Sequence, residues 1–147
     1  MKPITATIHG YLDYLTVVVF LAAPKLLGLD GLPALLSWTL AGVHLALTLV
    51  TDFPLGWRPW LPFWIHGWVE RIVGPALVLI AFLPNFSSSS LAFGFYLFMG
   101  LLIVAVGWLT DYSSGAKQAL DASNWTENGP CCQSWNVIVA ALAAFFD

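Results

Sequence analysis

Four long apolar stretches limit what this chain can fold into. They cover about residues 3–27, 33–51 and 62–83, and a last stretch that runs from the serines at 87–90 to residue 110. A helix needs roughly 20 apolar residues to cross about 30 Å of hydrocarbon, so each stretch is long enough to span a membrane. Backbone groups in hydrocarbon must be hydrogen-bonded within a helix or a closed barrel. The sequence therefore predicts an all-α fold, an integral membrane four-helix bundle.

Composition supports a membrane protein and argues against one class of partner. Hydrophobic residues make up 59% of the chain and charged residues 9%, whereas soluble domains have about 45–50% and about 25%. The net charge is −3, with five Lys and Arg residues in total, which leaves no basic surface for a phosphate backbone. We expect the lipid bilayer to surround the protein, and we expect no nucleic acid partner.

A short motif occurs twice along the chain. Residues 8–13 read Ile-His-Gly-Tyr-Leu-Asp, and residues 65–70 read Ile-His-Gly-Trp-Val-Glu. A second echo, a Thr-Asp pair followed by an aromatic residue, closes an apolar stretch at 51–53 and again at 110–112. Self-similarity of this kind indicates an internal repeat, which places equivalent residues at equivalent points of the fold.

The chain is predicted to divide where the fourth apolar stretch ends. Residues 1–112 would form the membrane domain, as two parallel-repeat helical hairpins at 3–53 and 60–112. Residues 113–133 are polar and are predicted to form a linker or tail outside the bilayer. Residues 134–147 are largely apolar but too short to span a membrane as a helix. We expect this last segment to lie in the interface or to dock on a partner.

Four spans place both termini on one side of the membrane. Lys2, Arg58 and Lys117 lie on that side, and Lys25 lies in the loops on the opposite side. Because cytoplasmic loops are enriched in Lys and Arg, this distribution favours cytoplasmic termini. The expected location is a cell membrane that the chain crosses several times.

Histidine and carboxylate stand four residues apart in both copies of the motif, a spacing that puts them on one face of a helix. Aspartates also close the second and fourth apolar stretches on the same side of the membrane. Imidazoles and carboxylates are suitable ligands for a divalent metal, and helical bundles build such sites in their cores. Six residues are candidate metal ligands: His9, Asp13, His66, Glu70, Asp52 and Asp111.

Several interpretations of these residues stay open. In the structural one, each carboxylate accepts a hydrogen bond from its own histidine or from the backbone, and Arg71 neutralises one of the carboxylates. Binding of a divalent metal and handling of protons or ions are the alternatives. Bis-histidine haem is a weaker candidate, because the adjoining carboxylates would be buried beside the macrocycle. His44 lies near mid-helix, where we expect a bond to a backbone carbonyl or a buried water, with a pathway role as the alternative.

A wider resemblance rests on short segments spread over residues 3–112. They are Ile-His-Gly at 8–10 with Leu-Asp-Tyr at 12–14, Ala-Gly-Val-His at 41–44, Thr-Asp-Phe-Pro at 51–54, Ile-His-Gly at 65–67 and Thr-Asp-Tyr at 110–112. On these segments the chain resembles the small bacterial membrane proteins of the SPW-repeat type. Ala-Pro-Lys at 23–25 and Leu-Pro-Asn at 83–85 stand where Ser-Pro-Trp is expected. The resemblance implies a four-helix fold in a bacterial inner membrane; it implies no established activity and transfers no catalytic residues.

The first functional expectation is an accessory or interaction subunit of a larger membrane complex, without catalytic activity of its own. The chain has no nucleophile-and-base pattern, no phosphate-binding loop and no cysteine metal motif, and other membrane-protein subunits are the expected partners. The alternative is a metal-ion or proton binding or transport module that uses the duplicated His/carboxylate cluster. Side chains that converge with room for an ion favour the alternative, whereas separate local hydrogen bonds favour the subunit.

Overall fold

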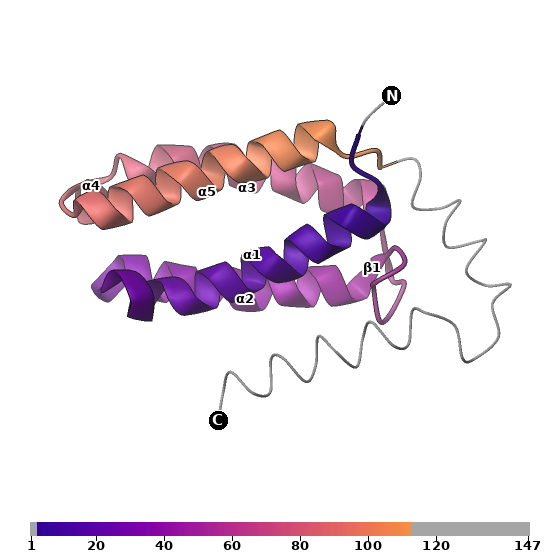
Figure 1. Ribbon diagram of the computed structural model, residues 1–147, viewed down its shortest axis with the longest axis horizontal. Coiled ribbons are helices and arrows are strands. Elements are labelled where there is room, and N and C mark those ends of the chain that lie inside the picture. Colours follow the sequence, from indigo (N-terminus) through magenta and orange to yellow (C-terminus); the bar gives the residue numbers. More distant parts are fainter. Residues whose placement is uncertain (1–2, 113–147) are drawn as a thin grey trace, which may run out of the picture.

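Four long helices dominate the computed structural model, which describes residues 3–112 (Figure 1). They are α1 (Ala6–Leu27), α2 (Gly31–Val50), α3 (Phe63–Ala81) and α5 (Ser90–Leu109). Each is long and apolar enough to cross a membrane, so the predicted all-α class is confirmed. The linker predicted at 113–133 and the docking segment predicted at 134–147 lie outside the described residues.

Local sequence explains where the helices begin and end. The Thr5 side chain caps α1 by accepting a hydrogen bond from the amide of Ile8 at 3.4 Å, and Ser89 caps α5 in the same way. Gly28 ends α1 with a φ of 61°, a left-handed conformation that glycine adopts without a steric penalty. A short helix that the sequence did not predict, α4 (Pro84–Ser87), lies in the loop before α5.

The long helices pack most closely within two hairpins, α1 with α2 and α3 with α5, and Figure 1 shows them as a lower and an upper pair. Glycines allow the close approach of α3 and α5. A Cβ atom added at Gly100 would lie 2.8 Å from the Val78 amide nitrogen and 2.9 Å from the carbonyl oxygen of Gly74. Small residues at such crossings let helix backbones approach each other in a membrane.

Short strand pairings join the two hairpins at one end of the bundle. The strand β1 (Thr51–Asp52) follows α2 and pairs in parallel with β2 (Leu61–Pro62), which precedes α3. Ile4, before α1, forms a parallel bridge with Thr110, after α5. The sequence did not predict these pairings. They gather the starts of α1 and α3 and the ends of α2 and α5 at the end where β1 is labelled in Figure 1.

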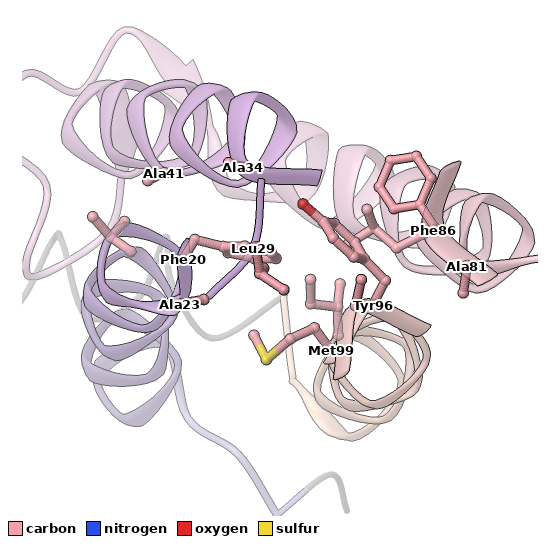
Figure 2. Close-up of a cluster of buried hydrophobic side chains, with 13 residues drawn as sticks. Phe20, Ala23, Leu29, Ala34, Ala41, Ala81, Phe86, Tyr96 and Met99 are labelled. Carbon is pink, nitrogen blue, oxygen red and sulfur yellow. The ribbon is translucent and has the colours of Figure 1, made fainter. Parts of the chain in front are cut away.

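The opposite half of the bundle is closed by an apolar core, part of which Figure 2 shows around Phe20, Phe86, Tyr96 and Met99. The buried Tyr96 hydroxyl on α5 donates to the carbonyl of Pro33 at 2.5 Å and lies 2.8 Å from Ser37 Oγ, both on α2. Because Tyr96 donates its hydroxyl proton to the carbonyl of Pro33, the Tyr96 oxygen accepts a hydrogen bond from the Ser37 hydroxyl. These bonds hold the hairpins together away from the repeated motif.

Candidate metal centre

Both copies of the motif point inward and meet at the joined end of the bundle. His9 and Asp13 come from α1, His66 and Glu70 come from α3, and all four side chains are buried. One possible ligand atom from each of the four lies within 4.8 Å of the others. The four side chains thus form a group that could hold a metal ion.

Contacts within this group run between the helices as much as along them. His9 Nε2 lies 3.3 Å from Asp13 Oδ1 and 3.5 Å from Glu70 Oε2. His66 Nε2 lies 3.4 Å from Asp13 Oδ2 and 3.8 Å from Glu70 Oε1. Histidine and carboxylate therefore alternate around a ring. The ring differs from two separate pairs. His66 lies closer to the carboxylate of the other motif copy than to its own, and His9 lies nearly as close to the carboxylate of the other copy as to its own.

Threonines at the ends of α2 and α5 orient the two imidazoles. His9 Nδ1 lies 2.9 Å from Thr110 Oγ1, and His66 Nδ1 lies 3.0 Å from Thr51 Oγ1. Each threonine hydroxyl already donates its proton to the carbonyl four residues earlier, at 2.8 Å for Thr110 and 2.6 Å for Thr51. The hydroxyl oxygen must then accept from the ring, which places the imidazole proton on Nδ1. In the neutral ring, Nε2 is left with its lone pair directed at the centre of the group.

This network explains the Thr-Asp echo in the sequence. The sequence revealed that Thr51 and Thr110 recur at equivalent positions, but it did not reveal that each contacts a histidine from the other hairpin. Orientation of a histidine by an acceptor on its second nitrogen is characteristic of metal-binding histidines, and it fixes both the tautomer and the direction of the ring.

The glycines of the motif make room for the aromatic residues of the echo. A Cβ atom at Gly10 would overlap the ring of Phe53, and one at Gly67 would lie 2.6 Å from the ring of Tyr112. Neither distance is compatible with a normal contact, so each ring can lie against its helix only because glycine follows the histidine. The motif thus combines a ligand with a site for close packing.

His44 is a third imidazole near the group. It comes from α2, and its Nε2 lies 3.4 Å from Asp13 Oδ1; its ring centroid lies 5.9 Å from that of His66. The sequence predicted contact with a backbone carbonyl or a buried water, and the structure places the ring beside a carboxylate. The sequence did not predict this contact, because it joins two different helices. His44 also lies outside the repeated motif and has no histidine counterpart in the second hairpin.

Tyr112 completes the surroundings of Glu70. Its hydroxyl donates to Glu70 Oε2 at 2.6 Å, and burial together with the nearby carboxylate raises the pKa of Tyr112, so that the hydroxyl stays a donor. The Arg71 guanidinium lies over the rings of Tyr112 and Trp68, 5.4 Å and 5.6 Å from their centroids. The carboxylate neutralisation predicted for Arg71 is thus replaced by stacking, and the close partners of Glu70 in residues 3–112 are histidines and Tyr112.

The remaining two candidate ligands lie away from the ring. Asp52 and Asp111 are half-buried just beyond the ends of α2 and α5, and they do not belong to the group of four. The backbone amide of Asp111 donates to the carbonyl of Ile4 at 3.0 Å. Their position one residue after the orienting threonines explains why the sequence pattern linked them to the histidines.

Electrostatics make this arrangement unfavourable without a cation or added protons. With both rings neutral, lone pairs of nitrogen and carboxylate oxygen face one another at 3.3–3.8 Å. The Nε2 atoms of His9, His44 and His66 and the Oδ2 atom of Asp13 are buried without a hydrogen-bond partner. Buried polar atoms without partners are costly, and clustered acceptors repel one another.

Haem fits this geometry poorly. The rings of His9 and His66 have centroids 5.4 Å apart and meet edge to face, and carboxylate oxygens lie between their Nε2 atoms. A macrocycle held by both nitrogens would need the space that these carboxylates occupy. The donor set therefore suits a small cation rather than a porphyrin.

Comparison with known proteins assigns no relative. No family model, no curated protein and no solved structure matches this chain.

Proposed function

We propose that this chain is a multi-pass membrane protein that binds one divalent transition-metal ion at the joined end of its two hairpins. The ligands are His9, Asp13, His66 and Glu70. The single observation that carries the proposal is the convergence of their lone-pair atoms while both histidine Nδ1 atoms are engaged by threonine.

Distances within the ring are close to those around a small metal ion. Zinc binds histidine nitrogen and carboxylate oxygen at about 2.0–2.2 Å, so neighbouring ligand atoms of a tetrahedral site lie roughly 3.3–3.6 Å apart. The shortest nitrogen-to-oxygen separations are 3.3, 3.5, 3.4 and 3.8 Å and use both oxygens of each carboxylate. With one atom from each residue, the four atoms lie within 4.8 Å of one another, so binding would draw them slightly closer together. Charge-assisted hydrogen bonds from protonated imidazoles would instead bring nitrogen and oxygen to about 2.7–2.9 Å. The spacing therefore supports a metal over a pair of imidazolium–carboxylate contacts.

Charge balance supports the same choice. Two carboxylates and two neutral imidazoles carry a charge of about −2, which is costly to bury among membrane helices. A divalent cation brings the group to neutrality without protonating any ligand. Two imidazoles with two carboxylates suit Zn²⁺, and also Fe²⁺ or Mn²⁺, better than Ca²⁺ or Mg²⁺, which prefer oxygen ligands.

Metal stoichiometry tests the proposal. The full chain, purified in a mild detergent, would be stripped with a chelator, reloaded with Zn²⁺, desalted and measured for metal per chain. We expect about one ion per chain, and we expect Asp13→Asn and Glu70→Gln to lose it. Asp52→Asn is the matched control, because it removes an aspartate outside the ring. Equal metal content in the Asp13 and Asp52 variants, each eluting as a folded protein, would remove the proposed centre.

An accessory role in a larger membrane complex is a second candidate, and it is compatible with the first. The observation that favours it is a set of exposed aromatic residues near the metal-binding end. Trp57 and Trp60 are 64% and 74% exposed, and Arg58 lies over both rings. Such rings suit either lipid headgroups or a protein partner. Co-purification of a stoichiometric second chain from the native membrane would support this role, and purification of the protein alone would count against it.

Location and ancestry belong to the same proposal. We infer a bacterial inner membrane with cytoplasmic termini, on the resemblance to SPW-repeat proteins and on the placement of Lys and Arg. We also infer that the metal centre arose by duplication of one hairpin, because each motif copy supplies one histidine and one carboxylate. Tagging the N-terminus and testing its access from either side of the membrane would check the orientation.

A further inference from the structure

A cavity of about 240 Å³ lies beside the candidate metal centre, between the two hairpins. Its inner end is polar and includes Asp13, His44 and Glu70. Its walls are apolar side chains, mainly from α1 and α5, and include Leu12, Val19, Met99 and Ile103. The cavity therefore joins a hydrocarbon-like space to the carboxylate–histidine group.

The position of the cavity follows from how the helices pair. Each hairpin packs closely within itself, whereas α1 and α5 contact each other much less. Three of the lining residues, Leu15, Phe98 and Leu102, also reach the outer surface, with exposures of 57%, 62% and 40%. Exposed apolar side chains on membrane-spanning helices face lipid. The cavity thus opens sideways, toward the hydrocarbon of the bilayer.

Polar atoms at the inner end lack hydrogen bonds. His44 Nε2 is buried without a partner and lies 3.4 Å from Asp13 Oδ1. His44 is not one of the four residues of the metal-binding group, and it lines the cavity. A hydroxyl group can accept from one neighbour and donate to another, and it is the simplest head group that satisfies both His44 and Asp13.

We propose that this cavity binds a small lipid-soluble molecule of the phenol or quinol class, with its ring among the apolar walls and its hydroxyl at His44 and Asp13. The size is sufficient, because an apolar cavity of about 150 Å³ in another protein binds benzene. The polar end selects a hydrogen-bonding head, and the apolar walls select a body that partitions into lipid. This site goes beyond metal binding and does not require the metal.

Photolabelling of the full chain in lipid nanodiscs tests the proposal. The probe is an alkylphenol with a diazirine on its alkyl chain, and labelled residues are mapped by peptide mass spectrometry. We expect labelling of the cavity faces of α1 and α5. Unlabelled 4-propylphenol should suppress it at concentrations roughly three- to ten-fold lower than 4-propylanisole, which cannot donate a hydrogen bond.

A matched pair of variants on α1 separates the cavity from the general lipid-facing surface. Val19→Phe fills the cavity and should reduce labelling, whereas Val18→Phe, at an exposed position outside the lining, should not. Equal competition by the phenol and the anisole in the wild-type protein would overturn the proposal, because the cavity would then hold any apolar chain. Labelling spread evenly over lipid-facing residues would also overturn it. Repeating the competition after chelation, with metal content measured on the same sample, distinguishes failure of this site from failure of the metal centre.

Discussion

Removing the hydroxyl of Thr51 or Thr110 should weaken metal binding without touching a ligand. Thr→Val keeps the shape of the side chain but deletes the oxygen that accepts from histidine Nδ1, at 3.0 Å and 2.9 Å respectively. Loss of such a second contact to a metal-binding histidine usually lowers affinity by about 10–100-fold, which corresponds to about 1.4–2.7 kcal/mol. Because the two contacts are nearly equal in length, the two variants should lose affinity to a similar extent.

Thr39→Val is the matched control for this prediction. The Thr39 hydroxyl donates to the carbonyl of Leu35 at 2.8 Å, as the two orienting threonines do to their own helices, but Thr39 is exposed and contacts no histidine. Affinity would be measured by competition with a chromophoric chelator in detergent. Thermal stability would be followed in parallel, since a buried N–H without a partner costs about 1–3 kcal/mol whether or not metal is bound. If Thr51→Val and Thr110→Val bind metal as tightly as Thr39→Val, the tautomer argument is wrong.

Three further outcomes are expected. Gly10→Ala and Gly67→Ala should each destabilise the fold by about 1–3 kcal/mol, because the added methyl overlaps an aromatic ring; Gly94→Ala, where an added Cβ meets nothing within 4 Å, should be neutral or stabilising in a thermal melt. Tyr112→Phe removes the donor to Glu70 and should reduce metal affinity in the chelator assay, and unchanged affinity would show that this contact is dispensable. Apparent metal affinity should fall as the pH drops from about 7.5 to about 5.5, because protons compete for the imidazole nitrogens; a flat pH profile would argue against histidine ligands.

Much of the fold could be predicted because hydrocarbon restricts the choices of a chain. Apolar stretches of about 20 residues form helices there, and the ends of the four stretches agree with the ends of the four long helices to within a few residues. The short strand pairings escaped prediction because they depend on which helix ends meet in space. The pairing of Ile4 with Thr110, for example, joins the two extremes of the described chain.

The candidate centre could be predicted only in part, for a similar reason. The spacing of His9 and Asp13 within one helix turn is visible in the sequence, and so is its recurrence. What the sequence does not contain is the distance between helices, which turns two local pairs into one ring and brings in His44. The aspartates at 52 and 111 drew attention by recurrence, whereas the neighbouring threonines make the contacts with the histidines.

X-ray absorption at the metal edge of the loaded protein tests the central claim most directly. The proposed centre predicts a first shell of about four nitrogen and oxygen atoms at about 2.0–2.1 Å, with outer-shell scattering from two imidazole rings that diminishes when His9 or His66 is replaced. A shell of about six oxygen atoms without imidazole scattering, or the absence of stoichiometric metal after reloading, would contradict the claim that His9, Asp13, His66 and Glu70 form a metal site.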